Sequence, residues 1–139
     1  MLLEQALQKY KFMEANLLAK KARLSQQIPD LKSALQLVGE LQSKNLLTED
    51  NKESGTMDVK YLLSDHVYGK ARVGKTDKVM LWLGANVMLE YPLEEAKGVL
   101  DKSMNSAVTS LDRTDKDLTF LIDQVNTTQV NTVSSWKWL

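Results

Sequence analysis

The stretch VMLWLGANVMLEY, residues 79–91, contains the strongest β-strand signal in the chain and decides the fold. Its first five side chains are apolar in both alternating sets: Val79, Met80, Leu81, Trp82 and Leu83. A strand with two apolar faces is expected to have protein on both sides. Residues 84–86 interrupt the run before Val87-Met88-Leu89 resumes it, which predicts two strands joined by a turn or bulge.

Two more strands are predicted upstream, at residues 59–63 and 67–73, with residues 74–77 as the turn before the strongest strand. The block at residues 57–91 therefore contains four short strands in two hairpins. So little sheet is not stable alone, and its exposed edges favour pairing with another subunit.

Heptad patterns flank this block on both sides. At residues 2–45 one sevenfold series is apolar for six consecutive heptads: Leu3, Tyr10, Leu17, Leu24, Leu31 and Val38. We expect its companion series to be Ala6, Met13, Lys20, Gln27, Ala34 and Leu41, with Leu7, Ile28 and Leu35 broadening the seam. Such repetition predicts a coiled coil.

At residues 93–136 the sevenfold series are Met104, Leu111, Leu118, Val125, Thr132 and Leu100, Ala107, Thr114, Leu121, Thr128. Each segment is a helix of roughly 60 Å at about 1.5 Å per residue. Pro29 removes a helical donor and is expected to kink the first helix without ending it. Pro92 is expected to begin the second helix.

The predicted fold class is α+β: a long antiparallel two-helix coiled coil with two small β-hairpins between the helices. We expect one domain over residues 1–139, with an N-terminal helix at 1–45, hairpins at 57–91 and a C-terminal helix at 92–138. Narrow seams bury less surface per residue than a globule of this length. We therefore expect partners to supply the missing burial.

Composition excludes several classes of function. The chain has 18 basic and 18 acidic residues without a long basic run, which argues against nucleic-acid and membrane-surface binding. It has no cysteine, and no apolar stretch is long enough for a membrane span or a secretory signal. We expect no cofactor, and the acceptor pattern at Asn126 is attributed to chance.

Residues 69–76, GKARVGKT, match the phosphate-binding loop pattern letter for letter. That chemistry needs a helix after the loop, whereas residues 78–83 predict a strand, so a hairpin turn is favoured over nucleotide binding. His66 is the only histidine and has no cysteine to share a metal site, which favours a structural role. We expect no enzyme, no catalytic residue and no metal site. A small nucleotide hydrolase stays as a minor alternative.

Antiparallel packing would bring the two chain ends together at one tip. Several apolar residues would gather there: Leu2, Leu3, Val133, Trp136 and Trp138. Such a patch is typical of an interaction site, while the alternative is that Trp136 only closes the seam.

The chain resembles the α-type subunits of the prefoldin family over nearly its whole length. The resemblance rests on residues 8–14 (QKYKFME), 27–32 (QIPDLK), 61–65 (YLLSD) and above all 76–91 (TDKVMLWLGANVMLEY). The abrupt start at Met1 departs from the family, in which an N-terminal extension is common, and so does the abrupt end at Leu139.

The resemblance implies a hexamer of two α-type and four β-type subunits, whose hairpins form a β-barrel platform carrying six coiled coils. It implies that the coils capture unfolded actin and tubulin and pass them to the cytosolic chaperonin without ATP. The platform residues would be Val79, Leu81, Trp82, Leu83, Val87 and Leu89, and the capture residues those at the tip. The expected location is the cytoplasm, with the nucleus also allowed. The alternative function is a coiled-coil scaffold or tether that joins native proteins.

Overall fold

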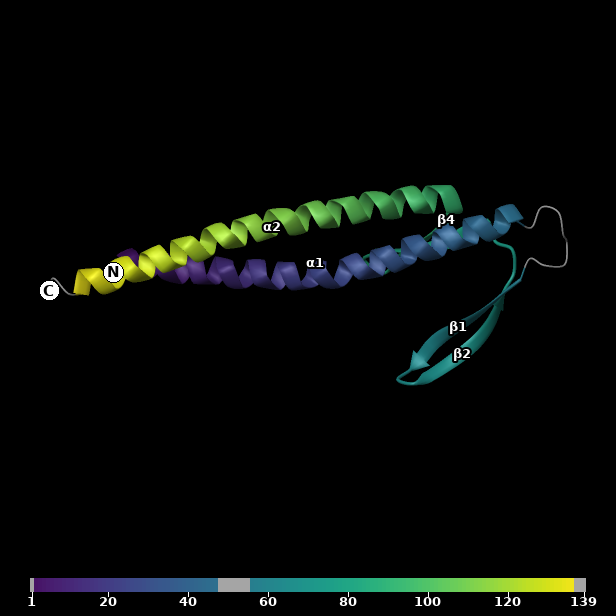
Figure 1. The fold of residues 1–139 in the computed structure, drawn as a ribbon, viewed down its shortest axis with the longest axis horizontal. Helices are drawn as coiled ribbons and strands as arrows, with labels where there is room; N and C mark the ends of the chain where they lie inside the picture. The colour runs from purple at the N-terminus through teal and green to yellow at the C-terminus, as the bar shows by residue number, and fades with distance from the viewer. Residues whose placement is uncertain (1, 48–55, 137–139) are drawn as a thin grey trace. The chain divides into compact units, whose positions relative to one another are not determined.

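The computed structural model describes residues 2–47 and 56–136. Helix α1 (Leu2–Leu47) is followed by strands β1 (Met57–Ser64), β2 (Val67–Val73), β3 (Lys78–Gly84) and β4 (Val87–Pro92), and by helix α2 (Leu93–Trp136). Figure 1 shows this order of helix, two hairpins and helix. It confirms the predicted fold class. Helix α1 continues through Pro29, as expected, whereas Pro92 ends β4 and α2 begins one residue later than predicted.

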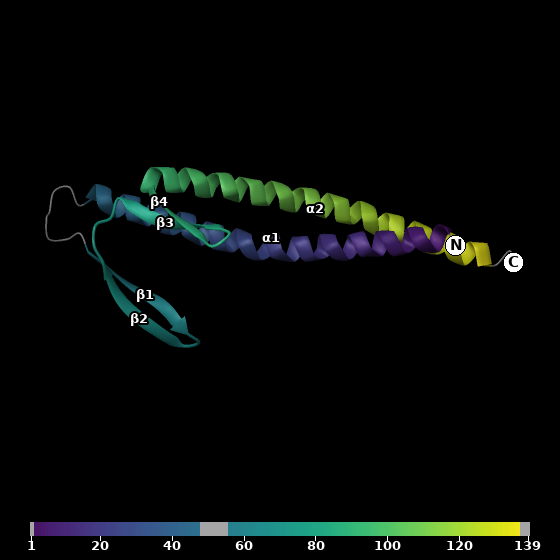
Figure 2. The ribbon, with the colours of Figure 1, turned by 180° about the vertical axis from the view of Figure 1, so that it is seen from behind.

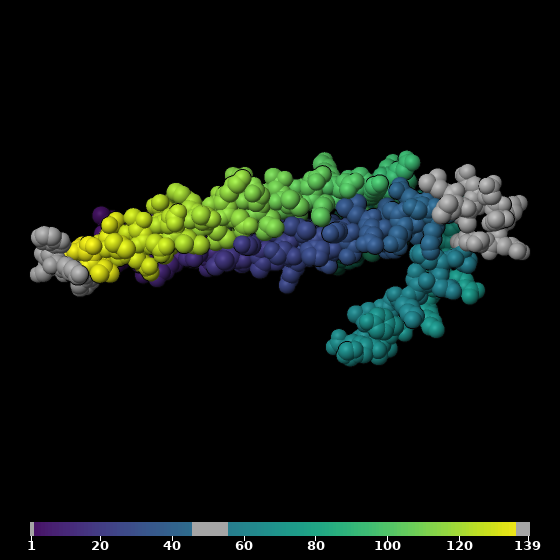
Figure 3. Space-filling model, viewed as in Figure 1, coloured from purple at the N-terminus to yellow at the C-terminus, as the bar shows by residue number. Residues whose placement is uncertain are grey.

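The chain divides into two compact units. Unit 1 contains residues 1–31 and 103–139, and unit 2 contains residues 32–102. In unit 1 the two helical segments run antiparallel, with the start of α1 beside the end of α2 in both ribbon views (Figures 1 and 2). The space-filling view shows the two segments in contact along their length (Figure 3).

The α2 side of the seam follows the predicted heptads. Leu118, Leu121 and Val125 are buried, and so are the threonines at Thr114 and Thr128. The Thr114 hydroxyl donates to the Ser110 carbonyl at 2.7 Å, and the Thr128 hydroxyl donates to the Gln124 carbonyl at 2.7 Å. A buried hydroxyl is thus satisfied within its own helix, so polar seam positions are tolerated here.

The α1 side of the seam confirms one predicted series and corrects part of the other. Leu24 and Val38 of the first series are buried. In the expected companion series Ala6, Ala34 and Leu41 are partly buried, whereas Met13, Lys20 and Gln27 are exposed. The series one residue later is partly buried throughout: Leu7, Glu14, Lys21, Ile28, Leu35 and Gln42. A heptad seam can be completed from either flank of the first series, and here the partner helix selects the flank that contains Lys21.

In unit 2, β1 pairs with β2 and β3 pairs with β4, both antiparallel, as two separate two-stranded sheets. Both hairpins turn over two residues after a register shift in the first strand. Ala85 and Asn86 have φ of 49° and 60°, and His66 has φ of 64°. Two consecutive left-handed residues are typical of the type I′ turn, whose twist matches that of the flanking strands.

The linker between the hairpins is tied to both helices of unit 2. The Asn45 side-chain amide donates to the Thr76 carbonyl, and the backbone N–H of Leu93 donates to the Asp77 carbonyl at 3.0 Å. Leu93 and Ala96, in the first turn of α2, are buried. These contacts position the start of β3 against the helix termini of the same unit.

Candidate functional site

The β3–β4 hairpin has two apolar faces, because its register pairs apolar residues across both. On one face Trp82 lies opposite Met88, and Met80 lies opposite Glu90. On the other face Leu81 lies opposite Leu89, and Val79 lies opposite Tyr91. The polar end of the first face carries an ion pair in which Lys78 Nζ lies 3.4 Å from a Glu90 carboxylate oxygen.

The described residues of the chain leave the face of Trp82 and Met88 open and cover the face of Leu81 and Leu89 only in part. Trp82 is 60% exposed and Met80 63% exposed. Of the residues expected to hold subunits together, Val79 and Leu81 are half-buried, whereas the others are exposed: Trp82, Leu83, Val87 and Leu89. Exposed, adjacent, large apolar side chains on both faces of one hairpin are typical of a surface that another chain covers. All six lie on the same hairpin, as the sequence predicted.

The sequence analysis missed a second apolar cluster at the tip of the β1–β2 hairpin. Five large side chains are exposed around its turn: Tyr61, Leu62, Leu63, Val67 and Tyr68. The sequence feature that could have predicted this cluster is the pair of short apolar runs on either side of Asp65-His66. Charged residues farther along both strands made the segment look like an ordinary half-exposed hairpin. This hairpin therefore also offers apolar surface to a partner.

The two faces of the β1–β2 hairpin differ in chemistry. Val59 lies opposite Ala71 and Tyr61 lies opposite Gly69 on one face. On the other face Asp58 lies opposite Arg72, whose Nε is 3.1 Å from the Asp58 carboxylate, and Lys60 lies opposite Lys70. The outer backbone edges of both hairpins have no strand beside them among the described residues. Such edges can accept a further strand.

The tip of unit 1 contains a shallow apolar groove. It is lined by Leu7 of α1 together with residues from the last turns of α2: Gln129, Val130, Thr132, Val133 and Ser134. The predicted tip residues Leu2 and Val133 are exposed, by 83% and 62%, and Leu3 is exposed as well. Trp138, and the side chain of Trp136, lie outside the described part of the chain. Val130 is an exposed member of this surface that the sequence analysis did not name.

The residues that match the phosphate-binding pattern do not form a phosphate cradle. Residues 69–73 belong to β2, and residues 74–77 link the two hairpins, so the prediction of a hairpin turn is wrong in detail. A strand, β3, follows the pattern as expected. The motif therefore lacks the helix N-terminus that would face a phosphate.

His66 and the carboxylates suggest no reactive centre. His66 is exposed in the β1–β2 turn. Over residues 2–47 and 56–136 no three His, Cys, Asp or Glu side chains are grouped so that they could hold a metal ion. The helices described there also include none long and apolar enough to cross a bilayer.

Comparison with known proteins assigns the family. The family model described as "Prefoldin subunit" matches residues 10–137. The chain belongs to the prefoldin family. Prefoldin subunits are co-chaperones rather than enzymes and associate with other prefoldin subunits, which agrees with the expectation from the sequence.

Individual relatives agree with this assignment. The chain is 46% identical to "Prefoldin subunit 3" of Mus musculus and of Homo sapiens over 136 residues, 98% of this chain and 66% of theirs. It thus spans slightly less than two thirds of the length of these relatives. It is 40% identical to "Probable prefoldin subunit 3" of Schizosaccharomyces pombe over 97% of this chain and 75% of the relative.

A solved structure has the same fold. It is the cryo-EM structure of filamentous prefoldin from Methanocaldococcus jannaschii, with a TM-score of 0.64 and 20% identity. The match covers 92% of this chain and 98% of the archaeal chain. The prefoldin arrangement of two helices around two hairpins is therefore shared with an archaeal member of low sequence identity.

Proposed function

We propose that this chain is an α-type subunit of a heterohexameric prefoldin with two α-type and four β-type subunits. The hexamer captures unfolded actin and tubulin at its coiled-coil tips in the cytosol. It then passes them to the cytosolic chaperonin without ATP. The observation that carries the proposal is the β3–β4 hairpin, which has two apolar faces, one left open and the other only partly covered by its own chain.

The hairpin supports assembly on energetic grounds. Burying apolar surface stabilises a complex by about 25 cal/mol per Å². Trp82, Met80 and Met88 on one face, and Leu81 and Leu89 on the other, could all be covered by partner strands. The free outer edges of the hairpins supply backbone groups for the same contact.

The apolar groove at the tip of unit 1 supports capture of unfolded chains. Leu7, Val130 and Val133 present a small apolar surface without a charged lining. A few exposed side chains bind an unfolded segment weakly. Several tips on one platform raise the effective concentration, so that a chain is held firmly while each contact stays reversible. Release then needs no nucleotide.

The test is reconstitution with β-type subunits, followed by native mass spectrometry and an actin-aggregation assay on the same sample. We expect a hexamer that suppresses aggregation. Trp82→Asp should abolish the hexamer, whereas Phe12→Asp, on an exposed position of α1, should preserve it. A chain that stays monomeric beside its partners would contradict the proposal.

Capture is separated from assembly by variants at the tip. Val130→Ser with Val133→Ser, and Trp136→Ser with Trp138→Ser, should leave the hexamer intact and weaken the suppression of aggregation several-fold. Val108→Ser changes an equally apolar, exposed position of α2 outside the tip groove and serves as the matched control. Unchanged suppression in both tip variants would refute capture at the tip. Binding of native partners alone would favour the tether.

A further inference from the structure

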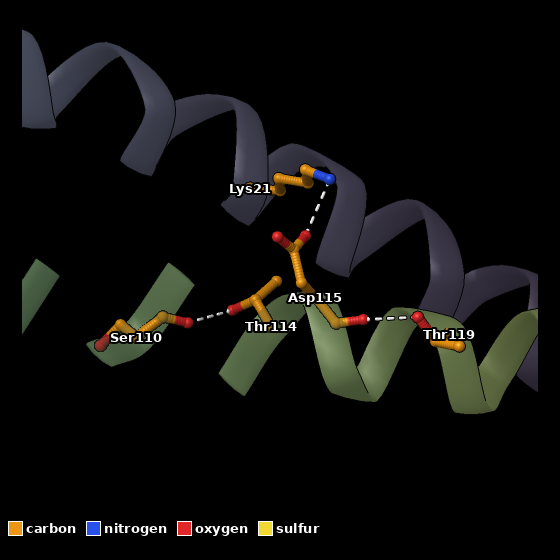
Figure 4. Close-up of polar contacts among 5 residues, drawn as sticks. All are labelled: Lys21, Ser110, Thr114, Asp115 and Thr119. Carbon is orange, nitrogen blue, oxygen red and sulfur yellow. Dashed lines mark hydrogen bonds and ion pairs between the residues drawn. The ribbon is translucent and has the colours of Figure 1, made fainter. Parts of the chain in front are cut away.

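Within residues 2–31 and 103–136, one ion pair joins the two helices of unit 1. Lys21 Nζ of α1 lies 2.8 Å from Asp115 Oδ1 of α2, and the two side chains are 45% and 47% exposed. Figure 4 shows the Lys21 ammonium reaching across to the Asp115 carboxylate. Lys21 occupies the partly buried α1 series, in the position that Leu7 and Ile28 occupy in other heptads.

The carboxylate depends on this lysine. Although the Asp115 side chain as a whole is half-exposed, its Oδ1 atom is buried and accepts no aligned hydrogen bond among the described residues. The Asp115 backbone carbonyl is already engaged, since the Thr119 hydroxyl donates to it at 3.0 Å (Figure 4). The neighbouring Thr114 is 1% exposed, so the seam is closed beside the ion pair. Without Lys21 this oxygen would have no ion-pair partner among the described residues.

The rest of the seam discriminates poorly between alternative registers. The α1 series contains leucines at Leu17, Leu24 and Leu31, and the α2 side of the seam contains a comparable row: Leu111, Leu118, Leu121 and Val125. If one helix slips past the other by a heptad, apolar residues still meet apolar residues. Repeated leucines therefore favour packing without fixing which layer meets which.

A slip by one heptad would break the polar layer in either direction. In one direction Lys21 would face Val108, and Asp115 would face Glu14, a like charge. In the other direction Lys21 would face Ile122, and Asp115 would face Ile28. Of the three registers, only the observed one pairs the ammonium with a carboxylate.

We propose that the Lys21–Asp115 ion pair selects the register in which α1 and α2 pack in unit 1. Its role is specificity more than stability, because a half-exposed pair adds little stabilisation. A single polar residue in a coiled-coil seam acts in this way when its alternatives leave it unpaired. Register decides which side chains of the two helices end side by side at the tip, so this pair also determines the composition of the groove formed by Leu7, Val130 and Val133.

The test measures register directly in the full chain. Because the sequence has no cysteine, spin labels can be placed at Ala22→Cys and Ser106→Cys, two exposed positions on opposite helices of unit 1. A slip of one heptad moves one helix by about 10 Å along the other. The label distance shortens in the direction that brings Asp115 to Glu14 and lengthens in the other.

We expect one distance in the parent chain. The apolar variant Lys21→Met with Asp115→Leu should show at least one further distance, displaced by several Å. Asp115→Ala alone should do the same, and it provides the result if the apolar variant aggregates. A single unshifted distance in the apolar or the alanine variant would overturn the proposal.

The matched control is a second ion pair of the same chemistry. Lys116 Nζ lies 2.7 Å from Asp112 Oδ2, but both residues belong to α2 and the pair spans no interface. Asp112→Ala should retain the single distance of the parent chain. A broadened distribution in this control would mean that loss of any carboxylate loosens the seam, and would also overturn the proposal.

Discussion

The helical seam of unit 1 and the β3–β4 hairpin of unit 2 are both rich in apolar residues, but only the seam is closed by its own chain. Leu118, Leu121 and Val125 are buried there. Met80, Trp82 and Met88 on the hairpin are exposed. Apolar content alone therefore does not distinguish a core from an interface. The difference lies in whether the chain itself supplies the second face.

The largest expected effect separates these two regions in the isolated chain. Leu121→Ala removes a buried seam side chain and should lower the free energy of unfolding by about 2–5 kcal/mol. Trp82→Ala removes a larger but exposed side chain and should change it by less than about 0.5 kcal/mol. Thermal and denaturant unfolding followed by circular dichroism at 222 nm, a wavelength that reports helix, provides the measurement.

Leu18→Ala is the control for the seam, because Leu18 is half-exposed on the same helical pair. Its effect should be well below that of Leu121→Ala. Should Trp82→Ala destabilise the isolated chain as much as Leu121→Ala does, the hairpin would have an internal core and the comparison would fail. In the assembled complex the order should reverse, with Trp82→Ala weakening association most.

Sequence patterns predicted the closed region and the open region unequally. Both α2 series were found because their apolar and threonine residues keep one phase across five heptads. The α1 companion series was wrong at Met13, Lys20 and Gln27, because the polar Glu14 and Lys21 do not look like seam residues. The later series was visible only in part, through Leu7, Ile28 and Leu35. Lys21 pairs with Asp115 of the other helix, a tertiary contact that the pattern of α1 alone does not reveal.

The strands show the same limit. Residues 79–83 predicted an interface because both faces are apolar, whereas the β1–β2 tip was missed because Asp58, Lys60, Lys70 and Arg72 alternate with its apolar face. A strand with one charged face resembles an ordinary half-exposed strand. Only the pairing of the two strands brings Tyr61, Leu62, Leu63, Val67 and Tyr68 around one turn.

A smaller effect on stability is expected in the β1–β2 hairpin, where one side chain packs against the opposite strand. The Tyr61 ring covers Gly69 of the opposite strand, and a Cβ added at Gly69 would lie 2.7 Å from Tyr61 Cζ. Gly69→Ala should therefore displace the ring and destabilise the β1–β2 hairpin by up to about 1 kcal/mol, against the usual gain from replacing a strand glycine. Hydrogen exchange of the β1 and β2 amides measures this local stability.

Gly74→Ala is the matched control, because nothing lies within 4 Å of a Cβ added there. In the Tyr61→Ala background the cost of Gly69→Ala should vanish, since the ring that the methyl group displaces is gone. If the cost persists without Tyr61, the contact does not stabilise the hairpin. The β1–β2 hairpin would then gain no stability from packing within the chain, as is expected at Trp82 of the β3–β4 hairpin.

The smallest expected effect concerns a charge pair that belongs to neither the seam nor the hairpins. The hydrogen bond from Lys116 to Asp112, reinforced by the charge of that carboxylate, raises the pKa of Lys116 above its ordinary value. A raised folded-state pKa contributes stability below the pKa of the unfolded state, and this contribution is lost as the pH rises through the folded pKa. The loss should therefore occur above about pH 10, where lysine titrates.

Because the Lys116 side chain is 75% exposed, solvent screens the pair and the loss should be barely measurable. Asp112→Asn lacks this contribution at every pH, so the difference in melting temperature between variant and parent should be flat between about pH 6 and 9 and should shrink above about pH 10. A difference that stays flat above about pH 10 would show that this exposed pair contributes nothing to stability.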